Sequence, residues 1–132
     1  MKALIYTRVM PDNKKVARPD RLQEQEKRCR DFLRDNRITP VRTYSDQGVM
    51  HPQRFLPGMR SLLQHLARSS EEMLVICDHP GRLGLKSDIQ KAVTAQIEDL
   101  GGRIITVMGT AEQYRASYST VENILVRLEK TK

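Results

Sequence analysis

Charged side chains stand at or just after the ends of three apolar runs of the chain. The runs are residues 3–9, 39–46 and 72–77, and the side chains are Arg8, Asp46, Asp78, His79 and Arg82. Two arginines and a histidine suit a phosphate group, because they donate charge-assisted hydrogen bonds to its oxygens. The two carboxylates could instead pair with the arginines and hold loops together, since a buried arginine needs a partner. The spacing leaves both interpretations open, and we favour the structural one.

The elements that must position these side chains alternate between strands and helices. Strand-like runs at 3–9, 39–46, 72–77 and 103–108 are separated by helical patterns at 19–36, 57–69 and 87–102, and a last helical pattern covers 119–132. This order predicts an α/β domain of three layers, with a mostly parallel central sheet of four or more strands. Ligands of such sheets bind beyond the carboxyl ends of the strands, which is where the charged residues fall.

Two of the helical patterns open with the spacing of a capping box. Ser87 pairs with Gln90 and Ser119 with Glu122, and Gly101 is placed to end a helix. The last helix has an apolar stripe that no later element covers, made of Val121, Ile124, Leu125 and Leu128. That stripe either packs back on the sheet or pairs with a second copy of the chain.

Length and composition narrow the class of protein. The 132 residues suffice for a single domain over 1–132, with an α/β core over about 1–110 and a terminal helix over about 117–132. No apolar run approaches the roughly 20 residues of a membrane helix, and no signal peptide opens the chain. Cys29 and Cys77 fit no metal-binding pattern and are expected to be buried thiols. We therefore expect a cytoplasmic protein with no metal, no small-molecule cofactor and no membrane contact.

The formal charge of +7 is concentrated toward the N-terminus. Residues 1–40 contain 11 basic and 6 acidic side chains, against 12 and 10 in residues 41–132. A polyanion such as DNA is a possible partner, although a basic helix such as 19–36 is usually just a solvated face. Aromatic residues make up 5% of the chain and tryptophan is missing, so no platform for stacking single-stranded bases is expected.

The order of short motifs resembles a known family. "YTRVM … RLQEQEKRC … YSDQG … LPGMRSLL … CDHPGRLG" is similar to the catalytic domain of the serine recombinases, the resolvase/invertase family. The family pattern runs Tyr-x-Arg-Val-Ser, Leu-x-x-Gln, Asp-x-Gly, Arg-Pro-Gly and Asp-Arg-Leu-x-Arg. The resemblance covers nearly the whole chain, in order, and it implies a resolvase-like domain whose long C-terminal helix dimerises and contacts DNA.

The resemblance also implies a chemistry. In the family a serine after the first strand attacks a DNA phosphodiester, arginines neutralise the phosphate, and no nucleotide cofactor takes part. Five family positions keep their residue type in this sequence, namely Arg8, Gln25, Asp46, Asp78 and Arg82. These are the residues that the resemblance places at a site for phosphate. From their residue types, Arg8, Arg82 and His79 are the candidates for binding the phosphate itself.

Several positions depart from the family pattern. Met10 takes the place of the nucleophilic serine, Leu56 of the arginine before Pro-Gly, and His79 of the arginine after the aspartate. Met50 and His51 stand where the family has Ser-Gly. A thioether cannot form a phosphate ester, and Leu56 removes a guanidinium of the kind that stabilises a transition state by a few kcal/mol. The departures together predict a degenerate site.

Another nucleophile is the weaker alternative. Thr7 should face the side of the sheet opposite to Arg8, whereas Ser45 beside Asp46 is better placed but has no evident base. A phosphate-ester hydrolase at the edge formed by Asp78, His79 and Arg82 is weaker still, because no metal cluster or glycine-rich phosphate loop supports it.

The leading hypothesis is a catalytically degenerate recombinase domain that acts in DNA recombination through a second copy or an active recombinase. The main alternative is an accessory nucleic-acid-binding protein that uses its basic surface. No helix-turn-helix or zinc-ligand pattern occurs, so we expect no separate DNA-binding domain in this chain.

Overall fold

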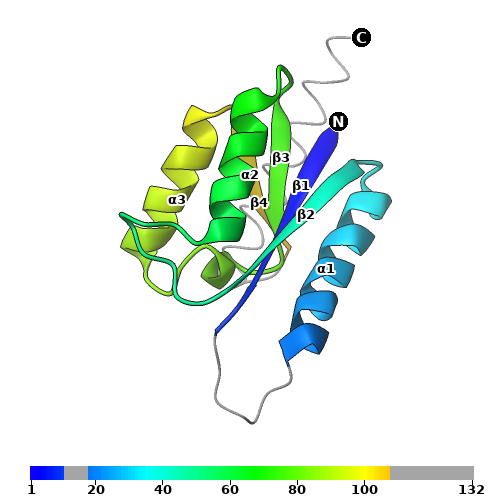
Figure 1. The fold of residues 1–132 in the computed structure, drawn as a ribbon. Coiled ribbons are helices and arrows are strands. Elements are labelled where there is room, and N and C mark those ends of the chain that lie inside the picture. The colour runs from blue at the N-terminus through cyan, green and yellow to red at the C-terminus, as the bar shows by residue number, and fades with distance from the viewer. Residues whose placement is uncertain (11–17, 108–132) are drawn as a thin grey trace.

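The fold is a four-stranded parallel sheet with helices on both faces (Figure 1). A computed structural model describes residues 1–10 and 18–107. The elements are β1 (Lys2–Val9), α1 (Arg18–Asp35), β2 (Thr39–Gln47), α2 (Pro57–Arg68), β3 (Met73–Cys77), a short 3₁₀ helix η1 (Pro80–Arg82), α3 (Ser87–Asp99) and β4 (Gly102–Thr106). The strand order is β2-β1-β3-β4, and every neighbouring pair is parallel. The predicted α/β class is confirmed.

Side chains of β1 alternate between two apolar clusters. Leu4 and Tyr6 pack in a cluster with residues of α2 and α3, whereas Ala3 and Ile5 pack in a cluster with Cys29 and other residues of α1. Figure 1 shows α1 on one side of the sheet and α2 with α3 on the other. A parallel sheet covered on both faces needs apolar residues at nearly every strand position, as the wholly buried β3 shows. The three layers are therefore as predicted.

The start of α3 differs from its prediction. Ser87 does not cap the helix, because the N-cap is Lys86 and no side chain bonds the free N–H groups there. The side-chain amide of Gln90 instead donates through Nε2 to the carbonyl of Gly84, at 2.9 Å. The end of the helix was predicted correctly: Gly101 adopts a φ of +88°, a left-handed conformation that glycine reaches without a steric cost.

The predicted terminal helix, with Val121, Ile124, Leu125 and Leu128, lies outside the described residues. So does the second capping box of Ser119 and Glu122. Of the helices in the described part of the chain, none combines the length and the apolar character that crossing a membrane requires.

Candidate functional site

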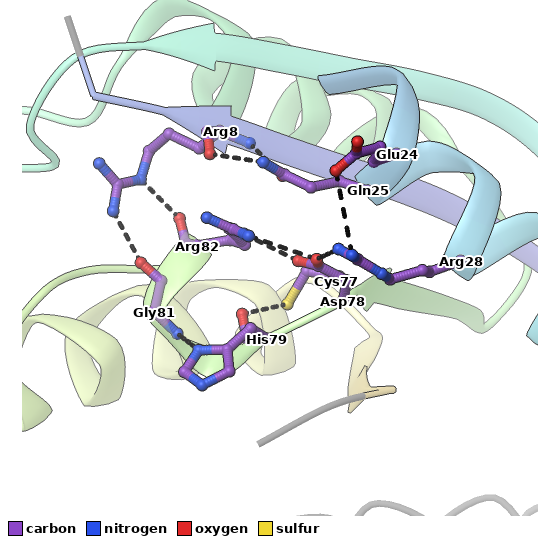
Figure 2. Close-up of polar contacts among 9 residues, drawn as sticks. All are labelled: Arg8, Glu24, Gln25, Arg28, Cys77, Asp78, His79, Gly81 and Arg82. Atoms are coloured by element: carbon purple, nitrogen blue, oxygen red, sulfur yellow. Dashed lines mark hydrogen bonds and ion pairs between the residues drawn. The ribbon is translucent and has the colours of Figure 1, made fainter. Parts of the chain in front are cut away.

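Arg8, at the carboxyl end of β1, connects the loops that follow β2 and β3. Its guanidinium donates through Nε to the carbonyl of Arg82 at 2.8 Å and through Nη2 to the carbonyl of Gly81 at 2.7 Å (Figure 2). A third hydrogen bond runs from Nη1 to the carbonyl of Gly48, at 2.5 Å. The residue is only 3% exposed, and this burial lowers the pKa of Arg8 from its usual value. Its donors are therefore directed at protein carbonyls.

Gln25 of α1 is bound to the main chain of Arg8. The side-chain oxygen of Gln25 accepts from the Arg8 N–H at 3.0 Å, and its Nε2 donates to the Arg8 carbonyl at 3.1 Å. Pairing between β1 and β3 ends at Ile5 and Ile76, so the main chain of Arg8 has no strand partner on that side. The buried amide supplies the hydrogen bonds that a neighbouring strand would otherwise make.

Met10 lies beside the guanidinium of Arg8. Its sulfur is 3.5 Å from Nη1 of Arg8, and 40% of the residue is exposed. A thioether is a weak hydrogen-bond acceptor and carries no proton to give up. Met10, at the position where the family resemblance implies a nucleophilic serine, is thus partly exposed beside an arginine. It has no hydroxyl or thiol that could attack a phosphate.

Asp46, at the end of β2, binds the start of α2. Its Oδ1 accepts from the Gly58 N–H at 2.7 Å, and its Oδ2 accepts from the Met59 N–H at 2.9 Å. The N-cap residue Leu56 makes no side-chain capping bond, so a carboxylate from another element takes over that role. The hydroxyl of Tyr6 donates to the same Oδ2 at 2.6 Å. Burial and this neighbouring carboxylate raise the pKa of Tyr6 above its usual range.

The sequence around α2 is adapted to this contact. A Cβ at Gly58 would lie 2.4 Å from the carbonyl oxygen of Ser45 and 2.8 Å from Oδ1 of Asp46, so only glycine allows the approach. Leu56 is half-buried against the apolar cluster that contains Met50, and its N–H lies 3.5 Å from the sulfur of Met50. Two of the positions where the sequence departs from the family pattern, Met50 and Leu56, therefore pack in or against the core.

Asp78, at the end of β3, is buried between two arginines. Arg82 approaches with two nitrogens, Nε at 2.8 Å from Oδ1 and Nη2 at 3.3 Å from Oδ2, and Arg28 of α1 places Nη1 3.0 Å from Oδ2. Figure 2 shows Arg28 and Arg82 reaching the carboxylate from opposite sides. Sequence reasoning treated Arg28 as part of a solvated helix face and missed this contact. Its position one turn after Gln25, at i and i+3, was the available signal.

His79 turns away from this ion-pair cluster. It is exposed, and its Nδ1 accepts from the Gly81 N–H at 2.9 Å at the start of η1. The ring thus shapes the loop whose carbonyls bind Arg8 and lies apart from the arginines (Figure 2). Among the residues that the structure describes, Asp78 is bound by Arg28 and Arg82, so it does not pair with His79 as acid and base.

Ser45, the alternative nucleophile considered above, faces the side of the sheet opposite to Asp46. Its hydroxyl lies 2.6 Å from that of Thr7, whereas the neighbouring Asp46 points toward Tyr6 and α2. Successive strand residues face opposite sides, so a serine adjacent to Asp46 in sequence cannot share its face. Thr7 is turned away from Arg8 as expected.

The structure thus brings Arg8, Gln25, Asp78 and Arg82 into one cluster, while Asp46 organises the neighbouring strand end. No group of three or more histidine, cysteine, aspartate or glutamate side chains within residues 1–10 and 22–107 is arranged to hold a metal ion. Cys29 and Cys77 are buried free thiols, and burial raises the pKa of Cys77 to about 12.

Comparison with known proteins gives a class for the fold. No family model matches the sequence, and no curated protein matches it. Solved structures do match. The C-terminal catalytic domain of ISC1926 TnpA, an IS607-like serine recombinase, has a TM-score of 0.66 and 17% identity, covering 98% of this chain and 99% of that one.

Two further structures agree. The N-terminal catalytic domain of TP901-1 integrase has a TM-score of 0.64 at 14% identity, covering 100% of this chain and 99% of that chain. A resolvase family site-specific recombinase from Streptococcus pneumoniae has a TM-score of 0.62 at 15% identity, covering 99% and 93%. The chain therefore has the fold of a serine-recombinase catalytic domain.

Proposed function

We propose that this chain is a catalytically degenerate serine-recombinase domain, acting in DNA recombination through a second copy of itself or an active recombinase. The observation that carries the proposal is the sulfur of Met10, 3.5 Å from the Arg8 guanidinium, where the resemblance places the nucleophilic serine. The attack that forms a phosphoserine link needs a hydroxyl whose proton can be removed. Methionine has no such group.

The surroundings of Met10 support the same conclusion. Arg8 donates to the carbonyls of Gly48, Gly81 and Arg82, and the charge of Arg82 is directed at Asp78. A group that stabilises a phosphorane must offer donors to oxygens of the substrate, whereas all three nitrogens of Arg8 and two nitrogens of Arg82 already bind protein oxygens. The residues that match the family are then retained because they connect β1, β2 and β3 at this edge.

A cleavage assay tests the loss of chemistry. The purified chain is incubated with supercoiled plasmid DNA and quenched with denaturant, and an active serine recombinase with its own site serves as the positive control. We expect relaxed or cleaved plasmid and a covalent protein–DNA species from the control alone. A DNA-linked species with the mass of this chain would overturn the proposal.

Solution mass tests the assembly role. We expect a dimer, alone or with an active recombinase, that becomes a monomer when residues 117–132 are removed, because the apolar stripe of that segment is then lost. A chain that stays monomeric at full length, with and without the recombinase, would contradict the assembly role while leaving the loss of catalysis standing.

A further inference from the structure

The segment formed by β2 and α2 carries arginines that form no ion pair with a carboxylate of the described residues. Residues 39–68 contain four arginines, and their single carboxylate is Asp46. That carboxylate is 6% exposed and is bound to Tyr6 and the start of α2, so it does not neutralise the surface. The arginines are Arg42, Arg54, Arg60 and Arg68.

A hollow of about 520 Å³ lies on this segment, between β2 at the edge of the sheet and the second half of α2. Its lining includes Arg42, Tyr44, Ser61, Gln64, His65 and Arg68. Since α2 runs back from the carboxyl ends of the strands, Arg68 lies toward their amino ends, away from the cluster around Arg8 (Figure 1). The hollow is thus separate from the site described above.

The side chains of the hollow hold one another in place. The guanidinium carbon of Arg42 is 5.2 Å from the centre of the Tyr44 ring, a cation–π contact that leaves its N–H donors free to bind an anion. The Tyr44 hydroxyl and Nδ1 of His65 are 2.7 Å apart, and the two rings meet edge to face. The arginine is therefore oriented before any ligand arrives.

The basic residues of α1 are in a different state. Arg28 pairs with Asp78, Arg30 with Glu26, and Arg34 with Asp31. By contrast, neither Arg42 nor Arg60 nor Arg68 forms an ion pair with the residues that the structure describes. The sequence had placed the basic surplus around the first helix. The structure thus gives Arg28, Arg30 and Arg34 of α1 acidic partners, while Arg42, Arg60 and Arg68 have none among the described residues.

We propose that this β2–α2 surface binds the phosphate backbone of double-stranded DNA. Arg60, Gln64 and Arg68 recur at i, i+4 and i+8, so they follow one side of α2. Arg60 and Arg68 are separated by about 12 Å along the helix axis, which exceeds the size of one phosphate group and suits a polyanion. Tyr44 is 9% exposed and packs under Arg42, so it offers no face on which an unpaired base could stack. The backbone of a duplex is the ligand that fits.

The binding surface is independent of the proposed loss of catalysis, and the two fail in different assays. Fluorescence anisotropy of a labelled 20-base-pair duplex of arbitrary sequence is measured with the full chain over about 50–200 mM salt. The test variant is Arg42→Gln/Arg68→Gln. The matched control is Arg30→Gln/Arg34→Gln, which removes the same charge from ion-paired positions on α1. Circular dichroism verifies that both variants are folded, as expected for exposed side chains.

We expect the wild type to bind with a steep salt dependence. The Arg42/Arg68 variant should lose affinity and reduce the slope of log K against log salt by about two, because two phosphate contacts disappear. The α1 control variant should keep most of the affinity and most of the salt slope. Equal weakening of the two variants, or no weakening of the test variant, would overturn the assignment to this surface. Inorganic phosphate that binds the hollow in the absence of any duplex binding would overturn DNA as the ligand.

Discussion

The ends of β2 and β3 each carry a buried aspartate, and the two carboxylates are satisfied by different kinds of donor. Among the described residues, the donors to Asp46 are neutral groups, the Tyr6 hydroxyl and two main-chain N–H groups of α2. Asp78 accepts from two charged guanidinium groups, those of Arg28 and Arg82. The first arrangement fixes where a helix begins, and the second attaches α1 and η1 to the same strand end.

Each of these two aspartates, which match the family pattern, has a structural role of its own. Both carboxylates are buried, and both oxygens of each accept hydrogen bonds. Removing either carboxylate would leave buried donors without an acceptor and destabilise the fold. Arg8 between them is engaged in the same way. Arg8, Asp46 and Asp78, which the resemblance assigns to a catalytic site, therefore each have a structural role in this fold.

The largest effect is expected for Asp46→Ala. Three donors lose their acceptor at once, and buried unpaired polar groups cost about 1–3 kcal/mol each, so we expect a loss of at least about 3 kcal/mol in the free energy of unfolding. Urea denaturation followed by circular dichroism measures it. Tyr6→Phe is the matched control, because it removes a single donor and should cost about 1 kcal/mol. A cost for Asp46→Ala no greater than that of the control would refute the capping role.

Gly58→Ala should have the next largest effect. The added Cβ would meet the Ser45 carbonyl oxygen at 2.4 Å, and main-chain atoms must move to relieve it. We expect about 1–3 kcal/mol of destabilisation. Because the same shift weakens the bonds to Asp46, the double variant with Asp46→Ala should cost less than the sum of the single variants. Strict additivity of the two substitutions would show that Gly58 and Asp46 act separately.

Alkaline pH should expose the contribution of Tyr6. Burial and Asp46 raise the pKa of Tyr6, so the unfolded chain loses the phenolic proton near pH 10 while the folded chain keeps it. The stabilisation is complete below pH 10 and is then lost as pH rises, by about 1.4 kcal/mol per pH unit. The raised pKa values of Cys29 and Cys77 act in the same direction from about pH 8.5. Urea unfolding from pH 8 to 11 should give a shallower decline for Tyr6→Phe, and identical slopes would contradict this origin.

The smallest expected effect is the difference in stability between lysine substitutions of the two arginines that bind Asp78. Arg82 contacts both carboxylate oxygens, whereas Arg28 contacts one. Lysine cannot reproduce the paired geometry, so Arg82→Lys should cost about 1 kcal/mol. Arg28→Lys should cost under about 0.5 kcal/mol, since 42% of its side chain is exposed. Equal losses in thermal or urea unfolding would mean that the paired geometry contributes nothing.

The sequence was sufficient for the sheet and its helices, because apolar periodicity reports on burial that is local to each element. Strands at residues 3–9 and 72–77 and the helix at residues 57–69 were predicted for that reason. The prediction that Ser87 caps α3 was wrong, because a capping box is a short pattern that many exposed serines satisfy. Lys86 takes the N-cap position instead.

The partners of the site residues were beyond the reach of sequence spacing. Asp46 caps a helix that starts eleven positions later, and Arg8 is bound by carbonyls of Gly48, Gly81 and Arg82, which any residue type could supply. Strand alternation could have excluded Ser45 on the ground already used for Thr7. Net charge per segment does not distinguish paired from free arginines, so it pointed to α1 and missed β2 and α2.

Met10→Ser tests most directly the proposal that the site is degenerate at more positions than that of Met10. The substitution returns a hydroxyl to a partly exposed position, so it should leave the free energy of unfolding almost unchanged. The variant is incubated with supercoiled DNA, quenched with denaturant, and examined for a covalent protein–DNA species beside an active recombinase. We expect none, because Arg8 remains bound to three carbonyls and Leu56 supplies no guanidinium. A covalent species from Met10→Ser would contradict this, and would show that the arginines at this edge still serve a phosphate.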